Sequence, residues 1–338
     1  MAKASLPRGG SRTIQVITPA LPDSKAGNRT TAHRWAELLG ALGHDVGIDT
    51  EWDGTPCDAM VALHAWRSRA SIAAFRSQHP KRLLIVALTG TDVYDYLERD
   101  PEPTRASMAM ADALVGLHDR LAQALPEEFR PKLHVIHQSA PTVGRKPASS
   151  DVFDVLVIAH LRDVKDPLRA AMAVRRLPET SQIRVTLLGD ALDETWERRA
   201  RTEASENPRF RWLGGVDAPT VQDHLARARV LVVSSRAEGG ANVVSEAIAA
   251  GTPIVASEID GNLGLLGRQW PATFPVGDEE ALRTWLLRLE SDRSTLAELE
   301  RSVRALAPRF TLEHERQTWQ ALLDQLGTGS KGHELGSP

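Results

Sequence analysis

The chain has 338 residues, which is long for one domain and sufficient for two domains of about 150 residues each. Its formal net charge is −3, so it lacks the positive field that general nucleic-acid binding requires. Cys57 is the only cysteine, which excludes a disulfide or a cysteine-based zinc site within one chain. No apolar run approaches the ~18 residues of a membrane span, and none follows the N-terminal basic residues, so we expect a soluble cytoplasmic protein.

In the first half of the chain, strand patterns alternate with helix patterns. Short apolar runs typical of buried parallel strands occur at residues 13–18, 58–65, 82–90, 112–118 and 132–140. A helix pattern with apolar residues at helical spacing follows the first of them and ends at Gly43. The alternation predicts a Rossmann-like, doubly wound α/β domain over residues 12–141.

A stretch rich in proline, glycine and serine, residues 141–151, predicts a linker to a second half of the same kind. Strand patterns return there at residues 152–160, 183–190, 210–215, 229–235 and 253–257. Helix patterns lie between them, and two more helices are expected after the last. We therefore expect a second Rossmann-like domain over residues 151–308, which faces the first across a cleft.

The C-terminal segment has a helix pattern with one apolar side. A helix is expected over residues 309–326, and it packs back on the N-terminal domain in this prediction. Its apolar side contains Leu312, Trp319, Leu322 and Leu323. The glycine-rich residues 327–338 are expected to form a disordered tail.

The most informative segment follows the strand pattern at residues 229–235. It contains Glu238, then Gly239 and Gly240, and then a helix pattern that begins near Ala241. The first turn of a helix offers free backbone N–H groups at the positive end of the helix dipole. Because the two glycines have no side chain to block an anion, the loop is suited to a phosphate or a sugar hydroxyl.

The helix after this loop contains a second carboxylate. Asn242 and Glu246 are four residues apart, so they share one face of the helix, and Glu246 is eight residues from Glu238. The alternative interpretation is a glycine-rich turn with two exposed carboxylates.

A cationic segment ends the first strand pattern of the second half, where Arg162 and Lys165 flank a turn. Seven of the 41 basic residues are lysines, and Lys165 stands in a long stretch that otherwise uses arginine. A compact ammonium with a planar guanidinium is suited to a diphosphate. The alternative is a solvated turn in which the two cations pair with Asp163 and Asp166.

Polar residues also follow the strand patterns of the first half. Gly27 lies beside a helix start, with Asn28 or Thr30 as the expected N-cap. This position is a second predicted binding site for an anion. The candidates for acceptor binding are Lys25, Gly27, Asn28, Arg29, His64, Arg67, Thr89, Gly90, His118 and Gln138. None of them is an obvious general base, and Arg67 has the alternative role of capping a helix or pairing with a surface carboxylate.

The second half resembles the GT-B glycosyltransferases of the family 4 type, because those enzymes carry two glutamates separated by seven residues and an Arg-and-Lys pair. The resemblance implies that Glu238 contacts the transferred sugar, that Glu246 binds the ribose and that Arg162 and Lys165 hold the donor diphosphate. It also implies that backbone groups at the next strand ends bind the donor base. The implied donor-binding residues are Arg162, Lys165, Gly189, Leu213, Gly214, Gly239, Gly240, Ala241, Asn242 and Glu246.

The first half contains a departure from that family. Many relatives have a His-Gly-x-Asp segment where this chain has Thr89-Gly90-Thr91-Asp92. With Glu238, Thr91 and Asp92 are the implied catalytic residues, but the missing histidine puts the usual acceptor and the usual handling of the donor sugar in doubt.

A narrower resemblance concerns residues 18–35, 62–71, 88–97 and 135–141. Together they look like the selenosugar synthases of the selenoneine pathway, which join a sugar from a UDP-sugar to selenium delivered as selenophosphate. This resemblance implies a UDP-sugar donor, with N-acetylglucosamine or glucose as the sugar, and a selenophosphate acceptor. A soft selenium nucleophile needs little help from a general base.

Other functions remain open at this stage. They are a glycosyltransferase with a hydroxyl acceptor, a UDP-sugar 2-epimerase and a non-catalytic nucleotide-sugar sensor. Retention or inversion at the sugar also stays open. No histidine pair has metal-ligand spacing with a carboxylate nearby, so we expect no metal and no cofactor.

Overall fold

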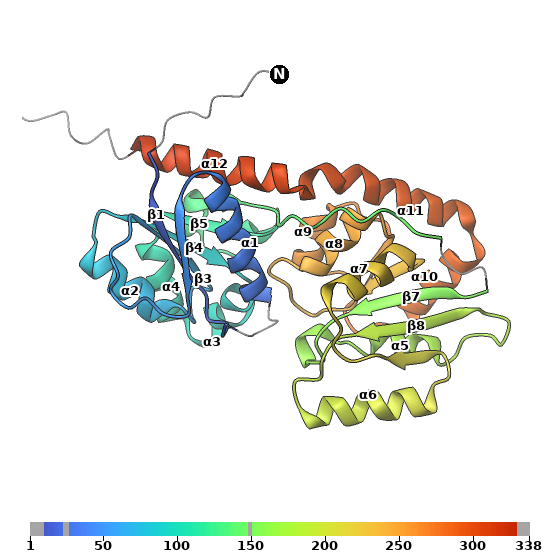
Figure 1. The fold of residues 1–338 in the computed structure, drawn as a ribbon. Helices are drawn as coiled ribbons and strands as arrows, with labels where there is room; N and C mark the ends of the chain where they lie inside the picture. The colour runs from blue at the N-terminus through green and yellow to red at the C-terminus, as the bar shows by residue number, and fades with distance from the viewer. Residues whose placement is uncertain (1–9, 23–26, 148–150, 330–338) are drawn as a thin grey trace, which may run out of the picture. The chain divides into compact units, whose positions relative to one another are not determined.

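A computed structural model describes residues 10–22, 27–147 and 151–329 of the chain (Figure 1). The chain divides into two compact units. The N-terminal unit comprises the chain up to Leu117, Ala122–Ile136 and the chain from Glu313 onward. The C-terminal unit comprises His118–Leu121 and His137–Leu312.

The N-terminal unit contains a six-stranded parallel sheet in the order β2-β1-β3-β4-β5-β6. Its strands are β1 (Thr13–Ile17), β2 (Asp45–Asp49), β3 (Ala59–Leu63), β4 (Leu83–Leu88), β5 (Ala113–Gly116) and β6 (Leu133–Val135). Its helices are α1 (Gly27–Ala41), α2 (Arg69–Gln78), α3 (Leu97–Arg99) and α4 (Pro101–Met110). Short helical turns are the π-helical η1 (Asp92–Tyr96) and the 3₁₀ turns η2 (Leu121–Gln123), which straddles the two units, and η3 (Glu127–Lys132).

The central strands of this sheet are buried on both faces, which explains their continuous apolar sequences. Every residue of β3 is buried, and β3 pairs with β4 from Ala59 opposite Leu83 onward. The edge strand β2 is different, because none of its residues is fully buried and its sequence DVGID begins and ends with an aspartate. The sequence patterns therefore missed β2.

The C-terminal helix α12 (Leu312–Gly329) supplies part of the N-terminal core. Trp319 is fully buried and contacts Trp35 of α1 edge to face, with ring centroids 4.9 Å apart. The indole of Trp35 also donates a hydrogen bond of 2.8 Å to the buried carboxylate of Glu315. This packing confirms the predicted return of the helix to the N-terminal unit, but Leu312 is 60% exposed and was wrongly placed on the buried side. The helix extends to Gly329, so the first residues of the expected tail are helical, and the rest lie outside the described residues.

The C-terminal unit contains a second six-stranded parallel sheet, in the order β12-β11-β10-β7-β8-β9. Its strands are β7 (Phe153–Ile158), β8 (Ile183–Leu188), β9 (Phe210–Trp212), β10 (Val230–Val233), β11 (Ile254–Ser257) and β12 (Thr273–Phe274). Its helices are α5 (Arg169–Val174), α6 (Glu194–Glu206), α7 (Ala218–Arg227), α8 (Asn242–Ala250), α9 (Asp260–Leu266), α10 (Glu279–Ser291) and α11 (Arg293–Leu306). Two 3₁₀ turns, η4 (Asp163–Lys165) and η5 (Ala307–Phe310), complete it.

The predicted class, two doubly wound parallel α/β sheets, is confirmed. The prediction of two helices after the last strand was wrong, because α9, β12, α10, α11 and α12 all follow β11. The expected linker also differs from a free connection. The Arg145 guanidinium donates to the carbonyls of Leu225 and Ala228, and Lys146 pairs with Asp223, so this segment is fastened to the C-terminal unit.

Candidate active site

The candidate donor site lies at the carboxyl end of the C-terminal sheet. There β7 and β10 are neighbours, but the chain continues from β7 to β8 on one side and from β10 to β11 on the other. The loops after β7 and β10 therefore diverge. In open parallel sheets, this switch in strand order is the place where ligands bind.

Lys165 and Glu238, predicted separately as phosphate and sugar ligands, meet at this switch point. The Lys165 ammonium donates to both carboxylate oxygens of Glu238, at 2.6 and 2.7 Å. The Ser235 hydroxyl donates to the same carboxylate at 2.5 Å. The Glu238 side chain is only 7% exposed and that of Lys165 is 19% exposed. Lys165 thus pairs with Glu238 rather than with the aspartates of its own turn.

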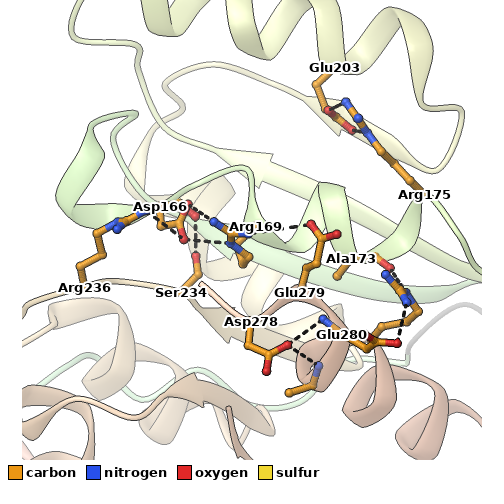
Figure 2. A network of polar contacts seen from close by, with 12 residues as sticks. Asp166, Arg169, Ala173, Arg175, Glu203, Ser234, Arg236, Asp278, Glu279 and Glu280 are labelled. Atoms are coloured by element: carbon orange, nitrogen blue, oxygen red, sulfur yellow. Dashed lines mark hydrogen bonds and ion pairs between the residues drawn. The ribbon is translucent and has the colours of Figure 1, made fainter. Parts of the chain in front are cut away.

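The turn that presents Lys165 is held by a network centred on Asp166 (Figure 2). Asp166 has a φ of 44°, in the left-handed region that non-glycine residues rarely adopt. Arg169 donates to its carboxylate at 2.9 Å, and the Ser234 hydroxyl donates to its carbonyl at 2.8 Å. Arg236 lies 4.0 Å from the same carboxylate. The network therefore connects the loops after β7 and β10.

The backbone of the Glu238 loop is in close contact with the start of α9. A Cβ added to Gly261 would lie 2.3 Å from the carbonyl oxygen of Glu238, a distance that only glycine permits. Behind the loop, the Ser257 hydroxyl donates to the Ser235 carbonyl, and the Asn262 amide donates to the Ser257 carbonyl at 3.0 Å. These contacts fix the loop from the side of β11.

Helix α8 begins at Asn242 with Ala241 as its N-cap, as the sequence pattern predicts. Among the residues that the structure describes, no side chain forms a hydrogen bond that caps this terminus. Gly239 is buried, whereas Gly240 is partly accessible. Glu246 is half-buried on the following turn. The helix N-terminus and the Glu238 loop thus belong to the same strand end, which suits an anionic ligand.

The ends of β8 and β9 contain the other predicted donor residues. Gly189 has a φ of 141°, and a Cβ there would lie 2.0 Å from the Ala159 carbonyl. Its N–H donates to the Gly214 carbonyl at 2.8 Å, which ties the two strand ends together. Leu213 is 44% exposed. Arg162, on the loop after β7, is exposed and has no ion-pair partner among the described residues.

In the N-terminal unit, His64 follows β3 and Thr91 follows the neighbouring strand β4. The His64 Nε2 lies 2.9 Å from the Thr91 hydroxyl, and the Nδ1 accepts a hydrogen bond of 3.2 Å from the Arg67 N–H. Nδ1 is therefore unprotonated and Nε2–H is the donor to Thr91. Burial lowers the pKa of His64, and the nearby Arg67 charge lowers it further, although Asp92 opposes both effects.

Asp92 is fully buried, and its carboxylate is saturated by backbone donors. One oxygen accepts the N–H groups of Ala65 and Thr89, each at 3.1 Å. The other accepts those of Gly90 at 2.8 Å and Val93 at 3.2 Å. Asp92 therefore connects the loops after β3 and β4, and its predicted part in catalysis stays a prediction.

The other predicted acceptor residues are distributed over both units. Lys25 lies outside the described residues. Gly27, Asn28 and Arg29 form the first turn of α1, which begins before the expected N-cap positions. Arg67 is exposed, and no ion pair or helix cap involves its side chain in the described ranges, so neither alternative role applies there.

His118 and Gln138 belong to the C-terminal unit, whereas the sequence assigned them to the acceptor domain. Both are buried. Burial lowers the pKa of His118 to about 4. Beside it, Asp119 contacts His137 at 3.0 Å and Arg309. Burial alone would raise the pKa of Asp119, but these two hydrogen-bond partners lower it to about 2.

Four further residues at these strand ends were not predicted as site residues: Ser235, Asp166, Arg169 and Arg236. The only signal for them was their position at strand ends beside selected residues. Within residues 10–22, 27–147 and 151–329, no group of three or more His, Cys, Asp or Glu side chains is arranged to hold a metal ion. No helix in that part of the chain is long and apolar enough to span a bilayer.

Comparisons with known proteins bear on this site. Residues 153–292 match the family model of glycosyl transferases group 1. The chain is 20% identical to glycosyltransferase 1 domain-containing protein 1 of Xenopus tropicalis, over 92% of this chain and 97% of that protein. Sucrose-phosphate synthase from Thermosynechococcus elongatus has a similar structure, with a TM-score of 0.79 and 17% identity over 95% of this chain and 100% of that one. HepE of Anabaena, solved with UDP, has a TM-score of 0.74 and 16% identity over 93% and 100% of the two chains.

These comparisons show the GT-B fold, and they show that residues 153–292 are similar to glycosyl transferases group 1. The matched residues, 153–292, contain both members of the Lys165–Glu238 pair and the whole of α8. The group 1 match therefore covers the candidate donor site of this chain. The acceptor residues of the N-terminal unit lie outside it.

Proposed function

We propose that this chain is a glycosyltransferase and that it takes its sugar from a UDP-sugar bound at the carboxyl end of the C-terminal sheet. The observation that carries the proposal is the Lys165–Glu238 pair, which places a cation for a diphosphate 2.6 Å from a carboxylate for sugar hydroxyls. Arg162, exposed on the same loop, adds a planar cation. HepE, which shares the fold, has been solved with UDP, with UDP and glucose, and with UDP-glucose.

Each remaining donor residue has a role in this proposal. The amides of Gly240, Ala241 and Asn242 bind a phosphate, because they begin a helix that has no capping side chain. Glu246, one turn further along α8, binds the ribose. Backbone groups at the ends of β8 and β9 bind the uracil. No divalent metal is required in the proposal, because Arg162, Lys165 and the helix N-terminus stabilise the departing UDP.

We further propose that the acceptor is selenophosphate and that the product is a selenosugar for selenoneine biosynthesis. A hydroxyl acceptor needs a base, but both nitrogens of His64 and both oxygens of Asp92 are already engaged in hydrogen bonds. Selenium is nucleophilic enough to attack without one. In the reaction, selenium forms a bond to the anomeric carbon, and the bond from that carbon to the UDP oxygen breaks. UDP leaves with the electron pair, and water then hydrolyses the Se–P bond, so that inorganic phosphate leaves and the free selenosugar remains.

One assay tests both levels of the proposal. The purified protein is incubated with UDP-N-acetylglucosamine or UDP-glucose, with or without selenophosphate, and UDP release is measured together with the mass of the sugar product. Selenophosphate-dependent UDP release and a selenium-containing sugar are expected, both unchanged by EDTA. Release of UDP with a sugar or metabolite alcohol instead would overturn the acceptor. An acceptor-independent change of the UDP-sugar would indicate an epimerase, and binding without turnover would indicate a sensor.

The Lys165→Ala variant tests the donor site itself. Loss of a charged hydrogen bond to phosphate should weaken UDP binding about 10- to 100-fold, since such a bond contributes about 1.5–3 kcal/mol. Lys146→Ala is the matched control, because Lys146 is a lysine of the same unit whose side chain is 46% exposed. Calorimetry on both folded variants decides the assignment. Equal UDP affinities for the two variants would place the diphosphate elsewhere.

A further inference from the structure

Glu238 is hydrogen-bonded to Lys165, which is the cation that the donor diphosphate needs in the proposed function. We propose that this makes Glu238 the residue that distinguishes the UDP-sugar from the product UDP. The inference rests on the proposed UDP-sugar donor. It concerns an exchange of partners at Lys165, in which the carboxylate of Glu238 is replaced by the diphosphate.

The geometry requires such an exchange. Both carboxylate oxygens of Glu238 accept hydrogen bonds from the Lys165 ammonium, so the pair is bidentate on the carboxylate side. The Lys165 side chain is 19% exposed and the Glu238 side chain 7% exposed, so a phosphate that approaches from solvent competes directly with Glu238 for the Lys165 ammonium. The carboxylate and the diphosphate are both anions, and one ammonium cannot neutralise both.

The exchange leaves a buried carboxylate that needs new donors. After it loses Lys165, Glu238 keeps the Ser235 hydroxyl as the donor that the structure places on it. A buried carboxylate with too few hydrogen bonds is strongly unfavourable. The hydroxyls of the transferred sugar are the donors that a UDP-sugar brings and that UDP lacks.

The two ligands therefore bind with different consequences. The UDP-sugar breaks the Lys165–Glu238 pair and gives each partner a replacement, phosphate for the ammonium and hydroxyls for the carboxylate. UDP breaks the same pair and leaves the carboxylate without a replacement. Glu238 thus weakens the binding of UDP relative to the UDP-sugar, and after transfer it returns to Lys165 and favours release of the product.

Glutamine at position 238 separates these effects, because it keeps the shape and loses the charge. The Glu238→Gln variant is expected to bind UDP at least about tenfold more tightly than the unchanged protein, since the competing anion is gone. Its affinity for UDP-glucose should rise much less, so the ratio of the two affinities falls. Calorimetry with UDP and with UDP-glucose measures both values. The product-inhibition constant of UDP should fall in parallel.

Two further variants keep the test decisive. Ser235→Ala removes the donor that the displaced carboxylate retains, so it should weaken UDP binding, the opposite sign to Glu238→Gln. In a Lys165→Met background, Glu238→Gln should no longer tighten UDP binding, because the contested cation is absent. Glu298→Gln, an exposed carboxylate on α11, controls for the change in net charge.

The outcomes separate the inference from the proposed function. If the unchanged protein binds neither UDP nor UDP-glucose, the donor proposal fails. If it binds both but Glu238→Gln leaves the UDP affinity unchanged or lower, the donor proposal stands and the exchange is wrong. If Glu238→Gln tightens both ligands equally, Glu238 competes for Lys165 but does not distinguish the two.

Discussion

Asp92 and Glu238 are both buried carboxylates that follow a central strand, one in each unit. Asp92 is bound by four backbone N–H groups of the loops after β3 and β4. Glu238 is bound by two side chains, Lys165 and Ser235. Backbone amides in a packed loop cannot leave their acceptor without unfolding the loop, whereas an ammonium on a flexible stem can change partners. We therefore expect the two carboxylates to differ in function, with Asp92 fixing a loop and Glu238 exchanging its partners when a ligand binds.

The largest expected effect comes from replacing Asp92, the carboxylate that is bound by backbone N–H groups. Asp92→Ala leaves four backbone donors without their acceptor, and each buried unsatisfied group costs about 1–3 kcal/mol, so we expect a loss of about 4 kcal/mol in the free energy of unfolding. Asp92→Asn keeps one acceptor oxygen and should lose about half as much. We call Glu238, with its partners Lys165 and Ser235, the responsive site. Glu238→Gln in this site should lower the free energy of unfolding less than either change at Asp92. Urea denaturation of the intact protein measures all three, and equal losses for Asp92→Ala and Glu238→Gln would remove the distinction.

The second largest expected effect is on the pH dependence of stability, and it comes from two buried histidines, His64 and His118, one in each unit. Burial lowers the pKa of His118 to about 4 from its ordinary 6.5 and lowers that of His64 as well. Between these values the unfolded chain binds more protons than the folded one, so stability falls as the pH falls from 6.5 toward 4. For His118 alone, the loss between pH 7 and pH 5 is about 2 kcal/mol.

The His118→Gln variant isolates this contribution. Its unfolding free energy should depend less steeply on pH between 7 and 5, with the contribution of His64 retained. His33→Gln, at an exposed position on α1, is the control and should keep the full slope. Asp119 does not interfere in this window, because its pKa is lowered to about 2 from 3.8 and its contribution is lost only below pH 4. An unaltered slope for His118→Gln would mean that His118 is accessible to protons in the folded state.

The responsive site shows what can be predicted from a sequence. The strand before it, the Gly-Gly loop and the start of α8 are local features, and their patterns predicted them within a residue or two. The Lys165–Glu238 pair joins residues 73 positions apart, and only the strand order brings them together. The composition of the sequence and the spacing of its residues do not specify that strand order. Both residues were therefore selected, but the interaction between them was not.

The fixed site, which is Asp92 and the loops after β3 and β4 that it binds, shows why other features were not predicted from the sequence. The sequence selected Asp92 as a catalytic candidate, but a carboxylate that binds backbone amides has the same sequence appearance as one that binds a ligand. The edge strands β2 and β12 were missed because strands that are short or only partly buried lack the continuous apolar pattern of central strands. His118 follows β5 as expected, yet the close approach of Gly264 to its ring associates it with the C-terminal unit.

A smaller effect is expected at the support of the responsive site. Asp166 holds the turn of Lys165 in a left-handed conformation, which costs about 1–2 kcal/mol for an ordinary residue such as alanine. Asp166→Ala should therefore displace Lys165 and weaken UDP binding about tenfold. Asp166→Gly tolerates the same φ and should keep most of the affinity despite the loss of Arg169 as a partner. Asp163→Ala, an exposed neighbour in the turn, is the control. Equal affinities for the alanine and glycine variants at 166 would show that backbone conformation is not the cause.

The smallest expected effect is on the KM of the acceptor, and it concerns Arg67, an exposed cation in the loop after β3. Its N–H donates to His64, but its guanidinium has no ion-pair partner among the described residues. It is therefore available to a phosphate-bearing acceptor. Because the position is exposed and screened by solvent, Arg67→Ala should raise the KM for selenophosphate only about fivefold. UDP affinity should stay unchanged, since the donor residues belong to the other unit.

Two variants control this last measurement. Arg67→Lys should recover part of the loss, because a point charge replaces a planar fork. Arg105→Ala removes the same charge from α4, where the guanidinium pairs with Glu128, and should leave the KM unchanged. Steady-state kinetics with selenophosphate varied at saturating UDP-sugar give all three constants. If Arg67→Ala and Arg105→Ala have the same KM, the acceptor does not contact the loop after β3, and its anionic group must be bound by other residues.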